Sequence, residues 1–150
     1  GGMFDGGMVL DLYAGSGANG LEALSRGYDY AVFADISKDA IQVIRKNIES
    51  LRCKEKTKVL HMPDKKALSL LKAEGIRFDL VYLDPPYARQ HNDEILEYLY
   101  ENKMITDRGV VVIESAKEDE FKKEFGSLKP YKEATYGITR ITYYRNEVEG

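Results

Sequence analysis

The stretch Phe78-Asp79-Leu80-Val81-Tyr82-Leu83-Asp84-Pro85-Pro86-Tyr87 reads as a buried strand that runs into an acid, two prolines and an aromatic residue. Its apolar run over 78–83 is typical of a strand covered on both faces. Pro85 and Pro86 lack the N–H that a sheet ladder needs, so the strand ends before them. Because a residue before proline is kept out of the helical region, Asp84 and Pro85 stay extended. The resulting loop presents a carboxylate, backbone carbonyls and a ring, which suit a planar group that carries an amino group.

Outside this stretch, apolar strand patterns alternate with helical patterns. We expect strands at 8–13, 30–34, 58–62, 78–83 and 109–114, helices at 21–26, 37–51, 65–74, 92–103 and 118–125, and a closing antiparallel hairpin from 131–136 and 139–144. The second helix carries Ile41, Ile44 and Ile48 on one stripe and has Ser37 as its N-cap. Such alternation predicts an α/β fold, Rossmann-like and doubly wound, with a mostly parallel sheet and helices on both faces. We interpret 1–150 as a single domain, with 1–7 as a tag remnant or disordered lead-in.

Four candidate ligand-binding residues occupy equivalent places in this predicted fold. Gly15, Asp35, Asp64 and Asp84 come at the carboxyl ends of strands one to four. In open parallel sheets ligands bind beyond these ends, near the point where strand order reverses. The sequence therefore predicts that the four residues share one rim of the sheet.

The first strand is followed by a glycine-rich loop, Ala14-Gly15-Ser16-Gly17-Ala18-Asn19-Gly20. Gly15, Gly17 and Gly20 match the G-x-G-x-x-G pattern. Asp35 follows at the spacing typical of an acid that accepts hydrogen bonds from ribose hydroxyls. This spacing serves both a nicotinamide dinucleotide and S-adenosylmethionine, so it does not separate the two cofactors. Asp11, inside the first strand, favours S-adenosylmethionine because a carboxylate there suits a cationic amino and sulfonium end. A dinucleotide would also leave Asp84-Pro85-Pro86-Tyr87 without a role.

Two further residues have alternative interpretations. Asp64 can accept a hydrogen bond from an adenine amino group, with the backbone of Lys65 nearby, or it can serve as the N-cap of the helix that follows. The single cysteine, Cys53, excludes an intrachain disulfide, fits a reducing compartment and is interpreted as a small apolar filler.

Composition narrows the class of protein. The 150 residues are 43% hydrophobic and 31% charged, as in an ordinary globular protein, and the formal net charge of −3 gives no overall signature of nucleic-acid binding. We see no apolar run long enough to span a membrane and no signal peptide pattern, so the cytoplasm is the expected location. His61 and His91 lack ligand spacing, so no metal is expected, and Ser16 has no recognisable triad partners.

Together these motifs resemble the RsmD-type 16S rRNA (guanine-N2)-methyltransferases, a family of class I S-adenosylmethionine-dependent enzymes. The resemblance rests on Asp11-Leu12-Tyr13-Ala14-Gly15-Ser16-Gly17, on Gly20-Leu21-Glu22-Ala23, on Phe78-Asp79 and on Asp84-Pro85-Pro86-Tyr87, with Asn47 and the Tyr136-Gly137 hairpin as additional matches. It extends over nearly the whole chain from Val9. The acid-proline-proline-tyrosine motif alone is shared with adenine-N6 and cytosine-N4 DNA methyltransferases.

The resemblance implies a seven-stranded sheet with a reversed last strand, S-adenosylmethionine as methyl donor, and 16S rRNA or an assembling small ribosomal subunit as partner. It implies catalytic roles for Asp84, Pro85, Pro86 and Tyr87, and cofactor contacts from Asp11, Ala14, Gly15, Ser16, Gly17, Gly20, Asp35, Ile36, Asp64 and Lys65. Tyr87, Arg89 and Arg140 are the expected substrate contacts, and His91 is a further RNA candidate. Members of the family carry an additional N-terminal segment, so we expect a chain starting this near the first strand to bind cofactor yet act weakly on RNA.

The predicted reaction is methyl transfer to the N2 amine of a guanine. Two alternatives stay open. The first is transfer to another amino group, on a DNA base, a protein amide or a small molecule. The second is a dinucleotide-binding oxidoreductase or a non-catalytic binding module. The absence of an inserted target-recognition domain weighs against a sequence-specific DNA enzyme.

Overall fold

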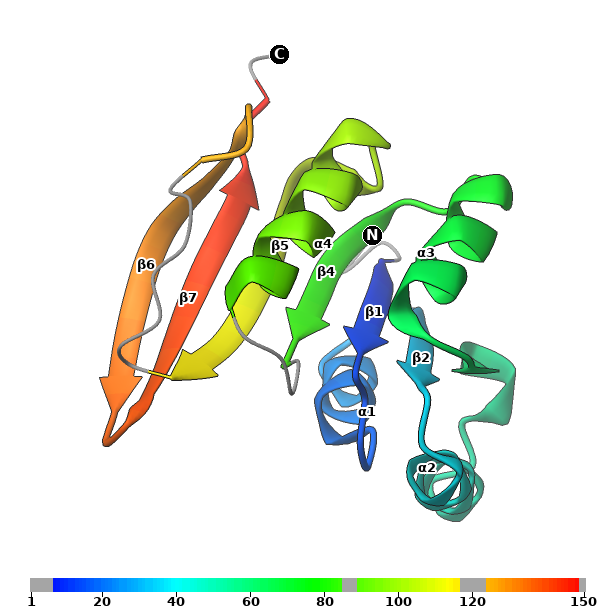
Figure 1. The fold of residues 1–150 in the computed structure, drawn as a ribbon. Helices are drawn as coiled ribbons and strands as arrows, with labels where there is room; N and C mark the ends of the chain where they lie inside the picture. Colours follow the sequence, from blue (N-terminus) through cyan, green and yellow to red (C-terminus); the bar gives the residue numbers. More distant parts are fainter. Residues whose placement is uncertain (1–6, 85–88, 117–123, 149–150) are drawn as a thin grey trace. The chain divides into compact units, whose positions relative to one another are not determined.

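The structure of the protein is a computed structural model that describes residues 7–84, 89–116 and 124–148, without the side chains of 89–91. Its contacts divide the chain into two compact units, Gly1–Ile76 and Arg77–Gly150. Each unit is described by itself below, with the element labels of Figure 1.

The first unit is built from three parallel strands and three α-helices. Its elements are β1 (Met8–Leu12), α1 (Ala18–Ser25), β2 (Tyr30–Asp35), α2 (Lys38–Ser50), a 3₁₀ turn (Lys54–Lys56), β3 (Thr57–His61) and α3 (Asp64–Ala73). Strand β2 lies between β1 and β3, and Asp11 stands beside Phe33 in the register. The carboxyl ends of all three strands therefore meet at one edge, as the alternating pattern predicts.

The core of the first unit follows from the apolar pattern of its strands and helices. Strand β2 is buried from Ala31 to Ala34 and accordingly reads as an unbroken apolar run. The predicted stripe of α2 is confirmed, since its buried residues are Ile41, Ile44 and Ile48. The Ser37 side chain accepts a hydrogen bond from Ala40 N at 3.2 Å, which confirms the predicted N-cap.

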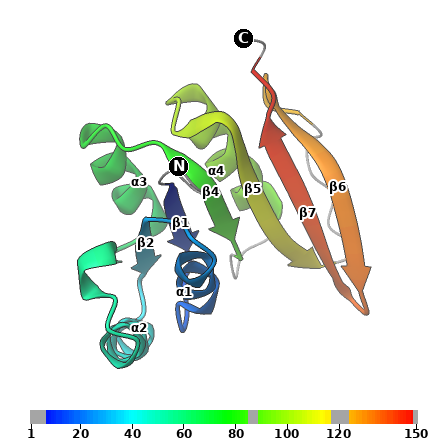
Figure 2. The same ribbon diagram turned by 180° about the vertical axis from the view of Figure 1, so that it is seen from behind.

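The second unit contains four strands and one described α-helix. Its elements are β4 (Phe78–Leu83), α4 (Arg89–Glu101), β5 (Ile105–Ala116), β6 (Leu128–Tyr136) and β7 (Thr139–Asn146). Strands β4 and β5 are parallel, β7 is antiparallel to β5, and β6 is antiparallel to β7. Helix α4 covers one face of β4 and β5 in both views (Figures 1 and 2). The α/β class, the seven strands, the closing hairpin and the reversed last strand are thus confirmed.

Some element boundaries differ from the sequence prediction. Strand β5 starts at Ile105 rather than Gly109, because its pairing with β4 tolerates a register shift between Phe78 and Leu80 and a left-handed Arg108 with φ of 68°. Helix α1 starts at Ala18 and α4 at Arg89, each three residues before the expected start. The helix expected over 118–125 lies outside the described residues up to 123, and Phe125 forms an isolated β-bridge with Leu128.

Candidate functional site

The loop that joins β1 to α1 reverses the chain through left-handed backbone. Gly15 and Gly17 have φ of 58° and 81°, a region that glycine enters without steric cost. Gly17 N donates to Ala14 O at 2.7 Å, which closes the turn. Tyr13 also has a positive φ, 66°, which is uncommon for a residue with a side chain and is held by surrounding contacts. The glycine pattern of the sequence therefore corresponds to a tight loop with left-handed backbone.

Asp35 closes this loop from the end of β2. Its Oδ2 accepts a hydrogen bond from Gly15 N at 2.9 Å, and its Oδ1 accepts from Ser37 N at 2.9 Å. Each carboxylate oxygen retains a second lone pair for another donor. Asp35 thus joins the glycine loop to the start of α2. It can still accept a further hydrogen bond, for example from a ligand hydroxyl group.

Asp11 performs a structural task that the sequence did not reveal. It is buried, with 2% of its surface exposed, and its Oδ2 accepts from Gly20 N at 2.9 Å. Gly17, the N-cap of α1, has no side chain to satisfy the amide groups of the first helical turn. The carboxylate of Asp11 supplies this acceptor from the neighbouring strand, and its negative charge suits the amino end of a helix.

Tyr13 links the same loop to α3. Its hydroxyl donates to Asp64 Oδ2 at 2.5 Å, while Asp64 Oδ1 accepts from Lys65 N at 2.6 Å. Asp64 is the first residue of α3 and Pro63 is its N-cap, so the N-cap alternative for Asp64 is wrong by one position. Gly15, Asp35 and Asp64 are therefore brought together by hydrogen bonds at one edge of the first unit, three of the four rim residues that the sequence predicts.

Two more side chains surround the loop. Asn47 of α2 donates from Nδ2 to Ser16 O at 3.0 Å and fixes the outer side of the loop. Ile36 is 58% exposed although it is a large apolar residue, and it directly follows Asp35. Its backbone oxygen lies 3.1 Å from His61 Nε2. An exposed apolar side chain beside the loop is a suitable surface for a flat ring.

Asp84 follows the last residue of β4 in the second unit. In the parallel register Leu83 stands beside Ile113, so the next residues, Asp84 and Glu114, stand beside each other as well. Alternation along the two strands places them on the same face of the sheet. The two carboxyl groups therefore lie close enough to interact, and a hydrogen bond between them would need one shared proton.

This pairing changes the acidity of Asp84. Partial burial of the carboxyl, the hydrogen bond with Glu114 and repulsion by the charge of Glu114 raise the pKa of Asp84 from 3.8 to about 6. A carboxylate with this pKa accepts a proton more readily than an ordinary aspartate. Sequence reasoning missed Glu114 because it lies 30 residues from Asp84, and only the strand register brings the two together.

Arg140, a predicted substrate contact, lies on β7 beside Ser115 of β5. Its Nε lies 3.8 Å from Glu133 Oε1, and 19% of its side chain is exposed. Alternation places Arg140 on the face of the sheet opposite to Glu114. The remaining predicted residues, Pro85, Pro86 and Tyr87, and the side chains of Arg89 and His91, lie outside the described part of the structure.

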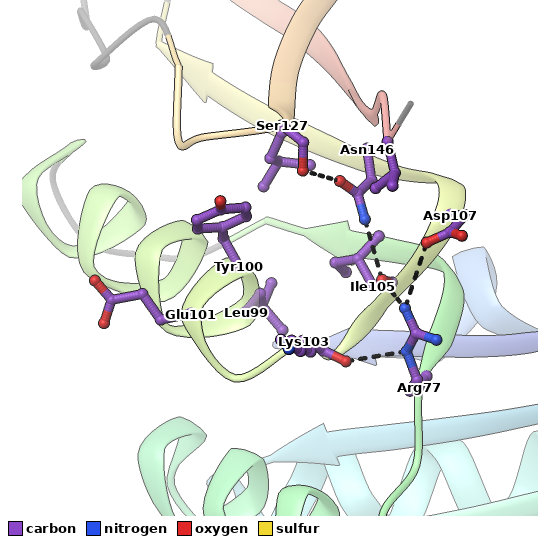
Figure 3. A pocket seen from close by; sticks show the side chains of 11 residues that line it. Arg77, Leu99, Tyr100, Glu101, Lys103, Ile105, Asp107, Ser127 and Asn146 are labelled. Atoms are coloured by element: carbon purple, nitrogen blue, oxygen red, sulfur yellow. Dashed lines mark hydrogen bonds and ion pairs between the residues drawn. The ribbon is translucent and has the colours of Figure 1, made fainter. Parts of the chain in front are cut away.

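A cavity of about 390 Å³ in the second unit lies away from Asp84. Figure 3 shows Arg77, Asp107, Ser127 and Asn146 around it, with Ser127 Oγ 2.5 Å from Asn146 Oδ1 and Arg77 Nη2 3.0 Å from Ile105 O. Arg77 precedes β4 whereas Asp84 follows it, which separates the two by about 20 Å of strand. These polar groups bind one another, so the cavity is a structural junction at the amino end of β4.

Two further findings concern the described residues. They contain no group of three or more His, Cys, Asp or Glu side chains arranged to hold a metal ion. Among the helices of this part of the chain, none combines the length and apolar character needed to cross a membrane.

A glycine loop with left-handed turns, closed by an acid at the end of the second parallel strand, defines a Rossmann-like protein of the nucleotide-binding class. The family model described as "Conserved hypothetical protein 95" matches residues 2–145, and the chain belongs to this family, that of the RsmD-type methyltransferases. The resemblance seen in the sequence is therefore confirmed.

Individual relatives cover most of the chain. It is 35% identical to "Putative rRNA methyltransferase YlbH" of Bacillus subtilis, over 95% of this chain and 77% of that protein. It is 29% identical to ribosomal RNA small subunit methyltransferase D of Escherichia coli K12, over 94% of this chain and 69% of that protein. A solved structure of a conserved hypothetical protein of Streptococcus pyogenes superposes with a TM-score of 0.88 at 38% identity, covering 96% of this chain and 88% of that one.

Proposed function

We propose that the chain transfers a methyl group from S-adenosylmethionine to an amino group of small-subunit rRNA, and that this group is the exocyclic N2 of a guanine in 16S rRNA. The observation that carries the proposal is the Asp84 carboxyl at the end of β4, paired with Glu114, in a chain of this family. The cytoplasm, where ribosomes assemble, is the corresponding place of action.

The residues of the first unit fit the proposed cofactor by their chemistry. The left-handed loop at Gly15 and Gly17 allows close approach of backbone to the methionine part, with Ala14, Ser16 and Gly20 in the same loop and Asp11 behind it. Asp35 would accept hydrogen bonds from the ribose hydroxyls, and Ile36 would pack against adenine. Asp64 and Lys65 would bind the adenine edge.

The target base would be held by the loop after β4. The carboxylate of Asp84 and the carbonyl of Pro85 would accept the two hydrogens of the amine, while Pro86 stiffens the loop and Tyr87 stacks on the base. Arg89 and Arg140 would contact the RNA backbone by charge. These roles need a base that is turned out of its stack.

When bound, S-adenosylmethionine supplies an electrophilic methyl group on a sulfonium. The exocyclic amine of guanine is a weak nucleophile because its lone pair is delocalised into the ring. By accepting both hydrogens, Asp84 and the Pro85 carbonyl favour a pyramidal nitrogen whose lone pair points at the methyl carbon. The Asp84 carboxylate also stabilises the positive charge that develops on nitrogen, and the alignment of donor and acceptor supplies much of the rate.

Two measurements test the proposal. Calorimetric titration with S-adenosylmethionine and NAD in parallel should show binding of the first alone, and saturable binding of NAD instead would favour the oxidoreductase alternative. Tritium transfer from labelled S-adenosylmethionine to small-subunit particles, free 16S rRNA and DNA should label ribosomal RNA, with the label in N2-methylguanine after digestion. Label in DNA or in another base would redirect the assignment to a different amino group.

A further inference from the structure

The carboxyl pair at the ends of β4 and β5 is held by the geometry of the sheet. Val81 and Leu83 stand beside Val111 and Ile113, and these four residues are buried on one face. Tyr82, Asp84, Val112 and Glu114 alternate with them and therefore share the other face. The backbone positions of the two acids are therefore set by the pairing of two strands whose adjacent residues are fixed in the core. The closeness of the two acids is thus a property of the fold.

The described neighbours of the pair on β4, β5 and β7 are mostly uncharged, while Lys132 of β6 lies over the ring of Tyr143, 5.2 Å from its centroid. On this face Glu114 stands beside Ile141 of β7, with Tyr143 two residues farther along that strand and Tyr82 two residues before Asp84 on β4. The nearest cation on β7, Arg140, projects from the opposite face and lies 3.8 Å from Glu133 of β6. Arg145 and Lys129 stand beside each other at the far end of the hairpin. Among these described groups, the principal partner of Asp84 is therefore Glu114.

We propose that Glu114 is a positioning residue of the methyl-transfer site, which orients the Asp84 carboxyl and shares with it the proton released by the methylated amine. This inference rests on the proposed function and adds a residue that acts through Asp84. Glu114 is exposed, so a proton on the pair has a direct route to water.

Methyl transfer to the amine ends with the release of one proton. The amine nitrogen uses its lone pair to form a bond to the methyl carbon, and the carbon–sulfur bond breaks with its electron pair going to sulfur. Nitrogen then carries a positive charge. One N–H bond breaks, its electron pair returns to nitrogen, and the proton moves to Asp84. The hydrogen bond between the two carboxyl groups then shares this proton with Glu114, which releases it to solvent.

The first test measures the pair without any methyl transfer. In the full chain with carboxyl-labelled aspartate and glutamate, carbon NMR titration follows Asp84, which is assigned by loss of its signal in Asp84→Asn. Replacing Glu114 by glutamine removes the neighbouring charge and should lower the pKa of Asp84 from about 6 by about one unit or more. Glu147→Gln, an exposed glutamate beyond the end of β7, is the matched control and should leave this pKa unchanged. An unchanged Asp84 pKa in Glu114→Gln would overturn the inference.

The second test separates proton sharing from a merely structural role. In wild type the acid limb of the kcat/KM profile should lie near pH 6. In Glu114→Gln this limb should move to lower pH while kcat at pH 8 falls about three- to tenfold, because a weaker base accepts the proton. Glu114→Asp should restore part of kcat at pH 8 and move the acid limb part of the way back toward its wild-type pH. A uniform loss of rate with an unmoved limb would contradict the inference. Absence of transfer to RNA in wild type would instead contradict the proposed function, and the NMR titration would still decide the pairing.

Discussion

Asp84 is the residue on which the proposed chemistry depends, and its replacement separates binding from transfer. Asp84→Asn keeps the shape of the side chain but removes the negative charge that stabilises the developing cation. We expect transfer to 16S rRNA to fall about 10²–10³-fold. The affinity for S-adenosylmethionine, measured by calorimetry, should stay within about twofold of wild type. Turnover near wild type in single-turnover assays would remove Asp84 from the mechanism.

The raised pKa of Asp84 also has a consequence for stability. The folded state holds this proton up to about pH 6, whereas an unfolded chain releases it near pH 3.8. The stability gained from protonation is therefore lost as pH rises through about 6, and the ionised carboxylate is unfavourable above it. Asp84→Asn should accordingly melt slightly higher than wild type at pH 7.5, by a margin that solvent screening of this exposed residue keeps small.

This difference in melting temperature should disappear at pH 4, where Asp84 is protonated and as neutral as asparagine. Thermal unfolding followed by circular dichroism across this pH range is the measurement. A destabilised Asp84→Asn protein at pH 7.5 would show that the carboxylate is favourable in the folded state.

Tyr13 is a second residue whose role became visible only in three dimensions. Tyr13→Phe removes the hydroxyl that donates to Asp64 at 2.5 Å and leaves the rest of the side chain in place. We expect a loss of about 1–3 kcal/mol in the free energy of unfolding, typical of a hydrogen bond to a charged group. Affinity for S-adenosylmethionine should fall with it, because the loop loses its link to α3.

Denaturant unfolding and calorimetry test this prediction. Tyr30→Phe is the control, since it removes a hydroxyl that donates to Thr57 O at 3.3 Å in the same unit but away from the loop. Equal cofactor affinities in the two variants would mean that the Tyr13–Asp64 bond does not shape the binding loop.

At the scale of elements, the position of α1 depends on close contact with β2. A methyl group on Gly20 would lie 2.5 Å from Cε1 of Phe33, a side chain with no exposed surface. Gly20→Ala should therefore cost about 1–3 kcal/mol of stability through overpacking. It should also displace the Gly20 amide from Asp11 and weaken binding of S-adenosylmethionine.

Gly75→Ala provides the comparison for Gly20→Ala. Gly75 has a φ of 72° and open space at its Cβ position, so this variant carries the backbone strain of a left-handed residue without a clash. It should lose stability but retain cofactor affinity in calorimetry. If Gly20→Ala bound the cofactor as well as Gly75→Ala does, close packing of α1 would not be needed for the loop.

The elements also show which parts of the structure a sequence pattern can predict and which it cannot. Apolar periodicity and glycine placement predicted the strands around Phe33 and Val81 and the stripe of α2, because burial is local to each element. The polar run 106–108 lay outside the strand predicted from Gly109, yet it continues β5 through an irregular pairing with β4. Glu114, Tyr13 and Asn47 act through partners 30 or more residues away, and such contacts depend on register and packing that one sequence does not encode locally.

At the scale of the whole molecule, binding of the cofactor should be linked to stability. A ligand that binds only the folded chain stabilises it by about 2.7 kcal/mol at 100 times its Kd. We expect S-adenosylmethionine to raise the melting temperature in a concentration-dependent way, and NAD at equal concentration to leave it unchanged. Differential scanning calorimetry measures both, and an equal shift with NAD would contradict the cofactor assignment.

Finally, the sheet of the second unit ends at β6, which stands last in its strand order. An outermost strand offers unpaired peptide groups on which a foreign chain can assemble. Here Pro130 lacks an amide hydrogen, the pairing is irregular between Pro130 and Lys132, and Lys129 and Lys132 add charge. These features discourage strand-by-strand association between molecules and should help a concentrated sample to resist fibril growth.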